Sequence, residues 1–179
     1  MGYSALKIKD ENIIKLIHSA LAGKKSAYAE IISHIEKDLF KFCFYLCKNQ
    51  QEAEDLYQDS CLQILQSLQS LKDIQLFKSW IFQIAKNKYL DFLKSPKNQK
   101  VESLDVLENK ISNDSTDQLD QVIRLKKALS QFDDDERLVL VLVDLHGFSY
   151  NEAAGILGVS EPSLRSKLSR IRQKFIAIY

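Results

Sequence analysis

The chain has 179 residues, of which 45% are apolar and 27% charged, a balance typical of a globular protein and not of a disordered one. Its formal net charge is only +1, and it contains no run of about 18 apolar residues that could span a membrane. Five glycines and two prolines provide few turns, which favours an all-α protein. The first residues lack the apolar segment and cleavage site of a secretory signal, so we expect a cytoplasmic protein.

Apolar residues recur at steps of three and four along most of the chain, which is the spacing of one helix face. In the first half this pattern predicts helices over about 10–21, 26–46, 51–68 and 77–93. Pro96 stops the last of these, and the polar stretch that follows has no periodicity. The second half predicts helices over 119–131, 134–145, 150–157 and 160–178. The expected fold is therefore two small helical domains joined by a flexible linker, with boundaries at 1–94, 95–118 and 119–179.

The three cysteines do not indicate a metal site or a disulfide. Cys43 and Cys47 share a helix face but lie among large apolar residues, and His18 and His34 are the only nearby histidines. We interpret the thiols as small buried apolar groups. The sequence also lacks a nucleophile–base pair and a glycine-rich phosphate loop. It therefore predicts no catalytic residue, metal, cofactor or small-molecule substrate.

The segment 147–175 carries the signals of two short helices joined by a turn. Ser149 and Glu152 are spaced as a capping box, and Gly158 is placed to end the first helix. Ser160 is placed to cap the next helix, with Pro162 in its first turn. Helix, glycine-containing turn and helix together form the helix-turn-helix signature.

The second of these helices has one apolar and one basic side. Its apolar stripe is followed by five basic residues after Glu161 and no further acid. This basic side is suited to a helix that reads DNA in the major groove. The alternative is a solvated face whose cations complement the helix dipole. The caps and turn favour DNA binding. The residues expected near base edges or flanking phosphates are Glu161, Ser163, Arg165, Ser166 and Lys167, and those expected at phosphates are Arg170 and Arg172.

Two stretches of the first half have contrasting charge. In "QEAEDLYQDS", Glu52, Asp55 and Asp59 share one helix face, which either docks on a basic protein surface or is simply solvated. In "FKSWIFQIAKNKYLDFLKSPKNQK", lysines alternate with aromatic residues, a composition suited to phosphates and exposed bases. Phe92 is expected to be core, whereas Lys86, Asn87 and Lys88 are expected to form a nucleic-acid face.

Three segments in this order resemble a bacterial RNA polymerase sigma factor of the extracytoplasmic-function (ECF) type. They are "AEDLYQDSCLQIL", "FKSWIFQIAKNKYLDFLK" and "DLHGFSYNEAAGILGVSEPSLRSKLSRIRQKF", and the resemblance extends from about Asp10 to Phe175. The resemblance implies that the first segment grips the polymerase clamp, the second recognises and melts the −10 element, and the third reads the −35 element. The implied partners are core RNA polymerase, promoter DNA and an anti-sigma factor.

The resemblance assigns roles to individual positions. The segment 66–76 would be the loop that captures a flipped base of the −10 element. The −35 contacts would come from the helix-turn-helix residues named above. The residues facing the polymerase clamp would be Glu54, Asp55, Gln58 and Asp59. The residues at the −10 DNA would be Lys78, Trp80, Lys86, Asn87, Lys88 and Asp91.

Four positions depart from the family pattern. Lys86 replaces an arginine, Asp133 replaces a proline, Gly155 lies inside a helix, and Pro162 comes early in the recognition helix. The last three concern how the −35 element is read. The main alternative function is an autonomous helix-turn-helix regulator with a helical partner-binding domain, which would bind duplex DNA tightly without polymerase.

Overall fold

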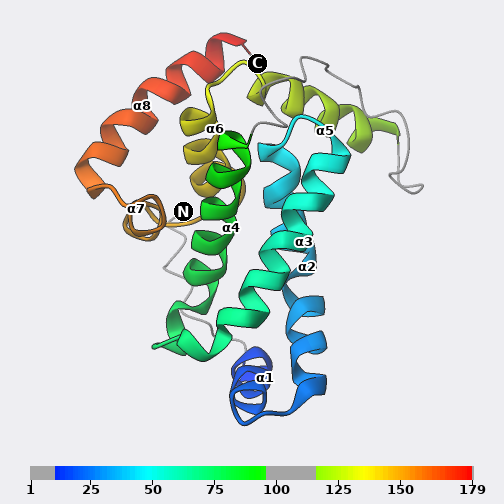
Figure 1. The fold of residues 1–179 in the computed structure, drawn as a ribbon. Coiled ribbons are helices and arrows are strands. Elements are labelled where there is room, and N and C mark those ends of the chain that lie inside the picture. Colours follow the sequence, from blue (N-terminus) through cyan, green and yellow to red (C-terminus); the bar gives the residue numbers. More distant parts are fainter. Residues whose placement is uncertain (1–10, 96–115, 179) are drawn as a thin grey trace.

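The computed structural model describes residues 11–95 and 116–178, and every regular element in these ranges is helical (Figure 1). The all-α prediction is confirmed. The predicted linker lies mostly outside the described residues. The α-helices are α1 Glu11–Leu21, α2 Lys25–Leu46, α3 Gln50–Ser67, α4 Phe77–Lys94, α5 Thr116–Leu129, α6 Asp134–Leu140, α7 Tyr150–Leu157 and α8 Glu161–Ile178. The short turns are η1 Leu68–Ser70, η2 Ile74–Leu76 and the π-helical η4 Val141–Leu145.

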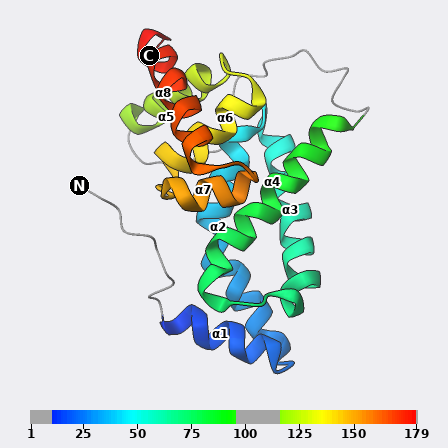
Figure 2. The same ribbon diagram turned by 90° about the vertical axis from the view of Figure 1, so that its left-hand side faces the viewer.

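Helices α1 to α4 form an N-terminal unit (residues 11–95). The helices α2, α3 and α4 pack side by side, and α1 lies across one end of α2 (Figures 1 and 2). The predicted stripe of α2 is buried as its spacing requires, from Ala27 through Ile31 and Ile35 to Leu39. Between α3 and α4, where the apolar periodicity of the sequence is weak, the chain forms the two short turns η1 and η2.

Helices α5 to α8 form a C-terminal unit (residues 116–178) that contains the helix-turn-helix. The Ser149–Glu152 capping box is confirmed, and Gly158 adopts the left-handed conformation with φ of 73°. The Ser160 hydroxyl accepts a hydrogen bond from the Ser163 amide at 3.4 Å, which confirms the predicted cap of α8. Asp133, which replaces the proline of the family pattern, caps α6 through a second capping box with Glu136.

The predicted helix 134–145 is interrupted. Its α-helical part ends at Leu140, and the chain continues as the π-helical turn η4. The amide of His146 then donates to the carbonyl of Val141 at 3.0 Å. This wider turn brings His146 and the following Phe148 against the N-terminal unit.

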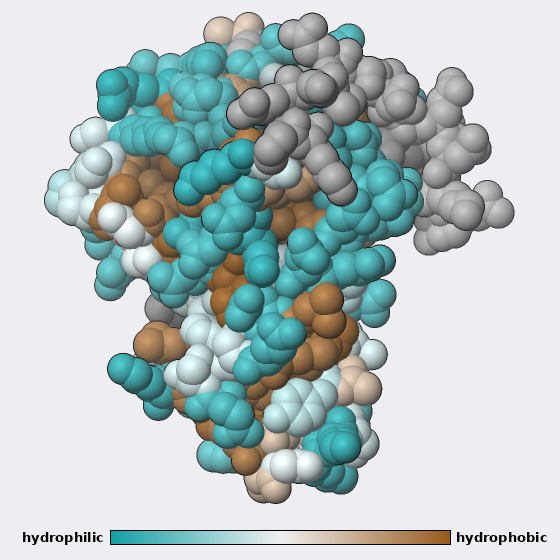
Figure 3. All heavy atoms as spheres, viewed as in Figure 1, coloured by the Kyte–Doolittle hydropathy of each residue, from teal (hydrophilic) through white to brown (hydrophobic). Residues whose placement is uncertain are grey.

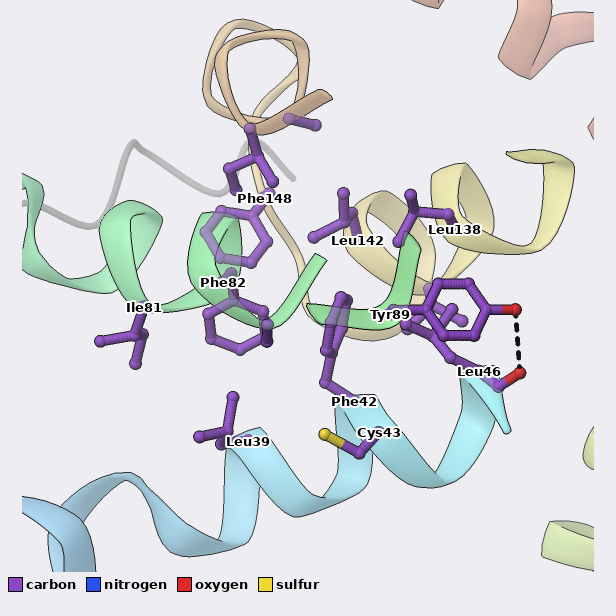
Figure 4. Packing of buried hydrophobic residues seen from close by; sticks show 14 of the residues in the cluster. Leu39, Phe42, Cys43, Leu46, Ile81, Phe82, Tyr89, Leu138, Leu142 and Phe148 are labelled. Atoms are coloured by element: carbon purple, nitrogen blue, oxygen red, sulfur yellow. Dashed lines mark hydrogen bonds between the residues drawn. The ribbon is translucent and has the colours of Figure 1, made fainter. Parts of the chain in front are cut away.

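The two units share a continuous buried core. Phe82 of α4 packs edge-on against Phe42 of α2 and Phe148 of the C-terminal unit, with ring centroids 5.1 and 4.9 Å apart (Figure 4). His146 lies in the same cluster, 5.0 Å from the Phe82 ring and 5.7 Å from the Phe42 ring. The packing between units is therefore as intimate as the packing within them.

A polar cluster joins the units beside this core. The Arg137 guanidinium donates to the Leu46 carbonyl at 2.9 Å, and also to the carbonyls of Leu129 and Phe132. The Tyr89 hydroxyl lies 2.7 Å from Asp134 Oδ1 and 3.2 Å from the Leu46 carbonyl, and donates its single proton to one of them (Figure 4). Arg137 thereby satisfies the last carbonyl of α2 and the turn after α5 at once.

The two glycines of the helix-turn-helix are expected to respond oppositely to alanine. Gly158→Ala places a Cβ on a left-handed residue and should lower the free energy of unfolding by about 1 kcal/mol. Gly155→Ala lies in helical conformation with nothing within 4 Å of the new Cβ, so it should raise that free energy by about 0.5–1 kcal/mol. Urea unfolding of both variants tests this; equal effects of the same sign would contradict it.

Candidate protein- and nucleic-acid-binding surfaces

Helix α3 presents an acidic face to solvent. Asp55, Gln58 and Asp59 are exposed, and Glu54 is partly exposed. Glu54 accepts a hydrogen bond from Gln50 at 2.7 Å and Asp55 accepts one from Gln51 at 3.1 Å, contacts that hold these carboxylates along the helix. The predicted residues are thus brought together on one face, and we call them the acidic face (Glu54, Asp55, Gln58 and Asp59).

Glu52, which the spacing places on the same side of the helix, is held by hydrogen bonds at the start of α3. Its carboxylate accepts hydrogen bonds from the Lys48 amide and the Asn49 side chain, each at 3.0 Å, while Asn49 caps the helix. The fixed position of Glu52 stabilises the start of α3.

Sequence reasoning missed Leu62. This side chain is 57% exposed and follows Asp55 and Asp59 at helical steps of four and three. In a sequence, a leucine at such a step is not distinguishable from a core residue, because only packing decides its exposure. Figure 3 shows apolar surface among polar side chains over the lower half of the molecule. Among the described residues of the N-terminal unit, Leu62 and Leu76 are the exposed large apolar side chains.

The two sides of helix α4 differ in their surroundings: one faces solvent, and the other faces the C-terminal unit. Asn87 and Asp91 are exposed to solvent, one helical turn apart. Lys78 and Lys86 lie four residues to either side of the buried Phe82 and so share its flank. The Lys78 ammonium lies 5.0 Å from the centroid of the Phe148 ring, a cation–π contact to the C-terminal unit. Burial lowers the pKa of Lys86 below its ordinary value.

The remaining predicted residues of α4 are partly buried. Trp80 stacks at a tilt on Phe77, with centroids 6.1 Å apart, and Lys88 is half-buried. Phe92 packs against the core, which confirms the interpretation of this aromatic residue as structural. The six predicted residues of α4 therefore do not form one exposed surface in this arrangement.

Helix α8 buries its predicted apolar stripe and exposes its basic side. Leu164, Leu168 and Ile171 are buried, and Phe175 stacks on Phe132 at 5.9 Å. The exposed predicted residues of this helix are Ser163, Arg165, Ser166 and Arg170.

Two of the predicted basic residues, Arg165 and Lys167, pair with acids of their own unit. Arg165 donates to Glu161 at 2.9 Å, and its guanidinium lies 4.5 Å from the Tyr150 ring centroid. Lys167 lies 3.7 Å from Asp135. Such exposed pairs contribute little to stability.

Arg172 has a different role from its neighbours. It binds both carboxylate oxygens of Asp144 and donates to the Tyr150 hydroxyl at 3.1 Å. The hydrogen bonds to Asp144 raise the pKa of its guanidinium. Arg172 thereby ties α8 to η4 and α7, whereas Arg170 is exposed and forms no ion pair with the described residues.

Arg172→Ala is expected to destabilise the C-terminal unit. Loss of the bidentate contact to Asp144 should lower the free energy of unfolding by about 1 kcal/mol, because the pair is only partly exposed. Urea unfolding measures this, and Arg170→Ala is the matched control, expected to leave stability unchanged. Equal losses in both variants would show that the Asp144 contact contributes nothing.

Comparison with known proteins identifies the two halves of this architecture. Residues 31–99 match the family model "Sigma-70 region 2" and residues 123–175 match "Sigma-70, region 4". An ECF RNA polymerase sigma factor, SigM of Bacillus subtilis, is 30% identical over 154 residues, which cover 84% of this chain and 93% of the relative. The chain belongs to the ECF sigma factors. SigM of Mycobacterium tuberculosis is 25% identical, over 89% of this chain and 81% of the relative.

Solved structures agree with the fold. CnrH, solved in complex with the cytosolic domain of CnrY, superposes with a TM-score of 0.70 at 23% identity, covering 94% of this chain and 96% of that one. RpoE of Bartonella quintana, solved with the anti-sigma factor NepR, gives 0.72 at 24% identity, covering 84% and 95%. The resemblance seen in the sequence is thus confirmed, and this sigma factor directs promoter-specific transcription.

The described part of this sigma factor holds no group of three metal-ligating side chains, and Cys43 and Cys47 are buried free thiols as interpreted from the sequence. Desolvation raises the pKa of both thiols well above the usual range, that of Cys47 to about 12. In the same residues, no helix combines the length and apolar character needed to cross a membrane.

Proposed function

We propose that this sigma factor divides its contacts among three helices: the acidic face of α3 binds core RNA polymerase, α4 contacts the −10 element and α8 contacts the −35 element. The observation that carries the proposal is the segregation of charge. Carboxylates gather on one exposed helix face of α3, which carries no lysine or arginine, whereas α4 carries four lysines and α8 carries five basic residues. A factor that joins a protein to DNA needs two such surfaces of opposite sign.

At the polymerase, the acidic face supplies complementary charge. Glu54, Asp55, Gln58 and Asp59 would meet a basic surface of the polymerase clamp. Leu62, which extends this face by one turn, would add apolar contact at its edge.

At the −10 element, the amide of Asn87 and the carboxylate of Asp91 are exposed and suited to base edges. Lys86 and Lys88 would contact phosphates, since lysine binds them as a point charge without the bidentate geometry of arginine. Lys78 and Trp80 would lie near the opened strand, where an aromatic ring stacks on unpaired bases.

At the −35 element, the exposed side of α8 would enter the major groove. Ser163, Arg165, Ser166 and Lys167 lie in its first turns, where recognition helices reach base edges. Arg170 would bind phosphate. Arg172, already bound to Asp144, would position the helix and reach a phosphate only by sharing its donors.

Further elements of the proposal concern partners and chemistry. We infer that an anti-sigma factor binds this chain, because RpoE, which has a similar fold, was solved with the anti-sigma factor NepR. CnrH, also similar in fold, was solved with the cytosolic domain of CnrY. The chain would act in the cytoplasm, without catalytic chemistry of its own. A pull-down that recovers polymerase alone under all conditions would count against the anti-sigma partner.

The experiment that tests the proposal is co-elution of the purified chain with bacterial core RNA polymerase in size-exclusion chromatography. A stable complex that then transcribes from a subset of a random promoter library supports the three-helix division. No complex, together with tight duplex binding by the chain alone, would favour the autonomous regulator.

A further inference from the structure

We propose that Asp135 and Glu136 of α6 compete with DNA phosphate for two lysines of α8, and so weaken the binding of α8 to duplex DNA of any sequence. The two lysines are Lys167 and Lys174, each of which forms an ion pair with one of these acids. The inference rests on the proposed contact of α8 with the −35 element. Helix α6 would thereby set how strongly its neighbour binds DNA.

Most basic side chains of α8 already have an acidic partner in the folded chain. The pairs are Arg165 with Glu161, Lys167 with Asp135, Arg172 with Asp144, and Lys174 with Glu136. The four carboxylates offset most of the positive charge that the sequence of α8 displays. The helix therefore attracts phosphate less strongly than its five basic residues suggest.

One flank of α8 has both of its lysines held by adjacent residues of another helix, α6, which packs against it. Lys167 and Lys174 lie two helical turns apart on this flank. The Nζ atom of Lys167 lies 3.7 Å from Asp135 Oδ2, and the two side chains are 38% and 74% exposed, so DNA can reach the pair. The Nζ atom of Lys174 lies 2.7 Å from Glu136 Oε2 and 4.9 Å from the centroid of the Phe132 ring.

A phosphate bound by either lysine would lie close to the carboxylate that holds this lysine in the free chain. A phosphate oxygen about 2.8 Å from the Nζ atom of Lys167 would be at most about 6.5 Å from the Asp135 oxygen. This separation is shorter than the Debye length of about 10 Å at 0.1 M salt, so the repulsion between the two anions is incompletely screened. The lysine either leaves its carboxylate or shares its charge with it, and each paired lysine therefore adds less to DNA binding than a free one.

The effect falls on phosphate contacts and not on base contacts. Binding to DNA of arbitrary sequence depends on phosphate contacts, whereas contacts to base edges carry the sequence information. Two weakened phosphate contacts therefore lower non-specific binding and leave base reading by the exposed side of α8 intact. Asp135 and Glu136 would act as positioning residues that raise the selectivity of α8 for its own site.

The test measures binding of the full chain to a fluorescein-labelled DNA duplex of random sequence by fluorescence anisotropy, over about 50–200 mM salt. The variant Asp135→Asn/Glu136→Gln removes both charges, and the glutamine amide can still accept the hydrogen bond from the Asp133 amide that caps α6. The matched control, Glu30→Gln/Asp120→Asn, changes the net charge equally at exposed positions of α2 and α5. Asp135→Asn alone serves if the double variant fails to fold.

We expect Asp135→Asn/Glu136→Gln to bind the duplex about fivefold more tightly, because each freed lysine gains a phosphate contact of the strength of an exposed ion pair. The slope of log affinity against log salt should steepen by about 0.9 for each lysine that gains a phosphate, which a change in stability alone would not produce. Asp135→Asn alone should tighten binding by about twofold. Asp135→Glu, which keeps the charge, and the control pair should bind as the wild type.

Removal of the lysines shows whether the gain passes through them. Adding Lys167→Ala and Lys174→Ala to the double variant should abolish the gain in affinity and the steeper salt dependence. The proposal is overturned if the acid variants bind as the wild type, if the control pair gains as much, or if the gain survives the loss of both lysines.

Arg170→Ala separates a failure of this proposal from a failure of the proposed role of α8. Arg170 is exposed on the same helix, so its loss should weaken duplex binding if α8 contacts DNA. If Arg170→Ala weakens binding but the acid variants do not tighten it, the competition is wrong and the role of α8 stands. If neither Arg170→Ala nor the acid variants change binding, the role of α8 fails, and the competition with it.

Discussion

Asp59→Lys is expected to lower the affinity for core RNA polymerase by about tenfold. Asp59 is exposed on the acidic face, and its reversal places a cation against the basic clamp surface proposed above. Juxtaposed like charges oppose association more strongly than the loss of one attraction. Because the attraction is between exposed charges, the difference should shrink as salt is raised.

Glu30→Lys is the matched control for this prediction. Glu30 is exposed on α2 and undergoes the same change of charge without belonging to the acidic face. Titration of polymerase with labelled chain at two salt concentrations compares the variants. Equal loss in both would mean that net charge matters and the acidic face does not.

His146 should make the stability of the whole chain fall in acid. Burial among Phe42 and Phe82 lowers its pKa from 6.5 to about 4, Asp38 acts in the opposite direction, and Lys41 and Lys78 reinforce the shift. The folded state therefore binds the proton more weakly than the unfolded state. Its stability is fully present above pH 6.5 and decreases as the pH falls from 6.5 towards 4, by about 3 kcal/mol in total.

His146→Phe isolates this contribution from the other titrating groups. The phenyl ring retains the aromatic packing and removes the titrating nitrogen. Urea unfolding of both proteins between pH 7 and pH 4 should show that the wild type loses about 3 kcal/mol more than the variant. Parallel curves would show that folding does not lower the pKa of His146.

The helices were predictable because their signals are local. Spacing of three and four fixed the faces of α2 and α8, and the caps at Ser149, Gly158 and Ser160 fixed the ends of α7 and the start of α8 within a residue. Each of these signals involves residues within one or two turns, which sequence alone displays. The segregation of charge between α3 and α8 was readable for the same reason.

Contacts between distant segments were not predictable. No periodicity indicates that Arg137 reaches the Leu46 carbonyl, 91 residues away in sequence, or that Phe148 packs on α4. No pattern in the sequence indicates the π-helical turn that places His146 against Phe82. Sequence reasoning assigned Lys78 and Lys86 to the −10 DNA, and it gave no sign that their flank of α4 faces the C-terminal unit.

The pairing of Arg165 with Glu161 and Tyr150 has a consequence for how promoter preference changes between related factors. Arg165 is held by a carboxylate on one side and a ring face on the other, so its direction is set before DNA arrives. A substitution at Glu161 would free the guanidinium to turn toward a different base pair, although Glu161 itself need not touch that base. The set of promoters that related factors recognise can therefore diverge through a substitution at Glu161, which orients Arg165, before Arg165 itself is substituted.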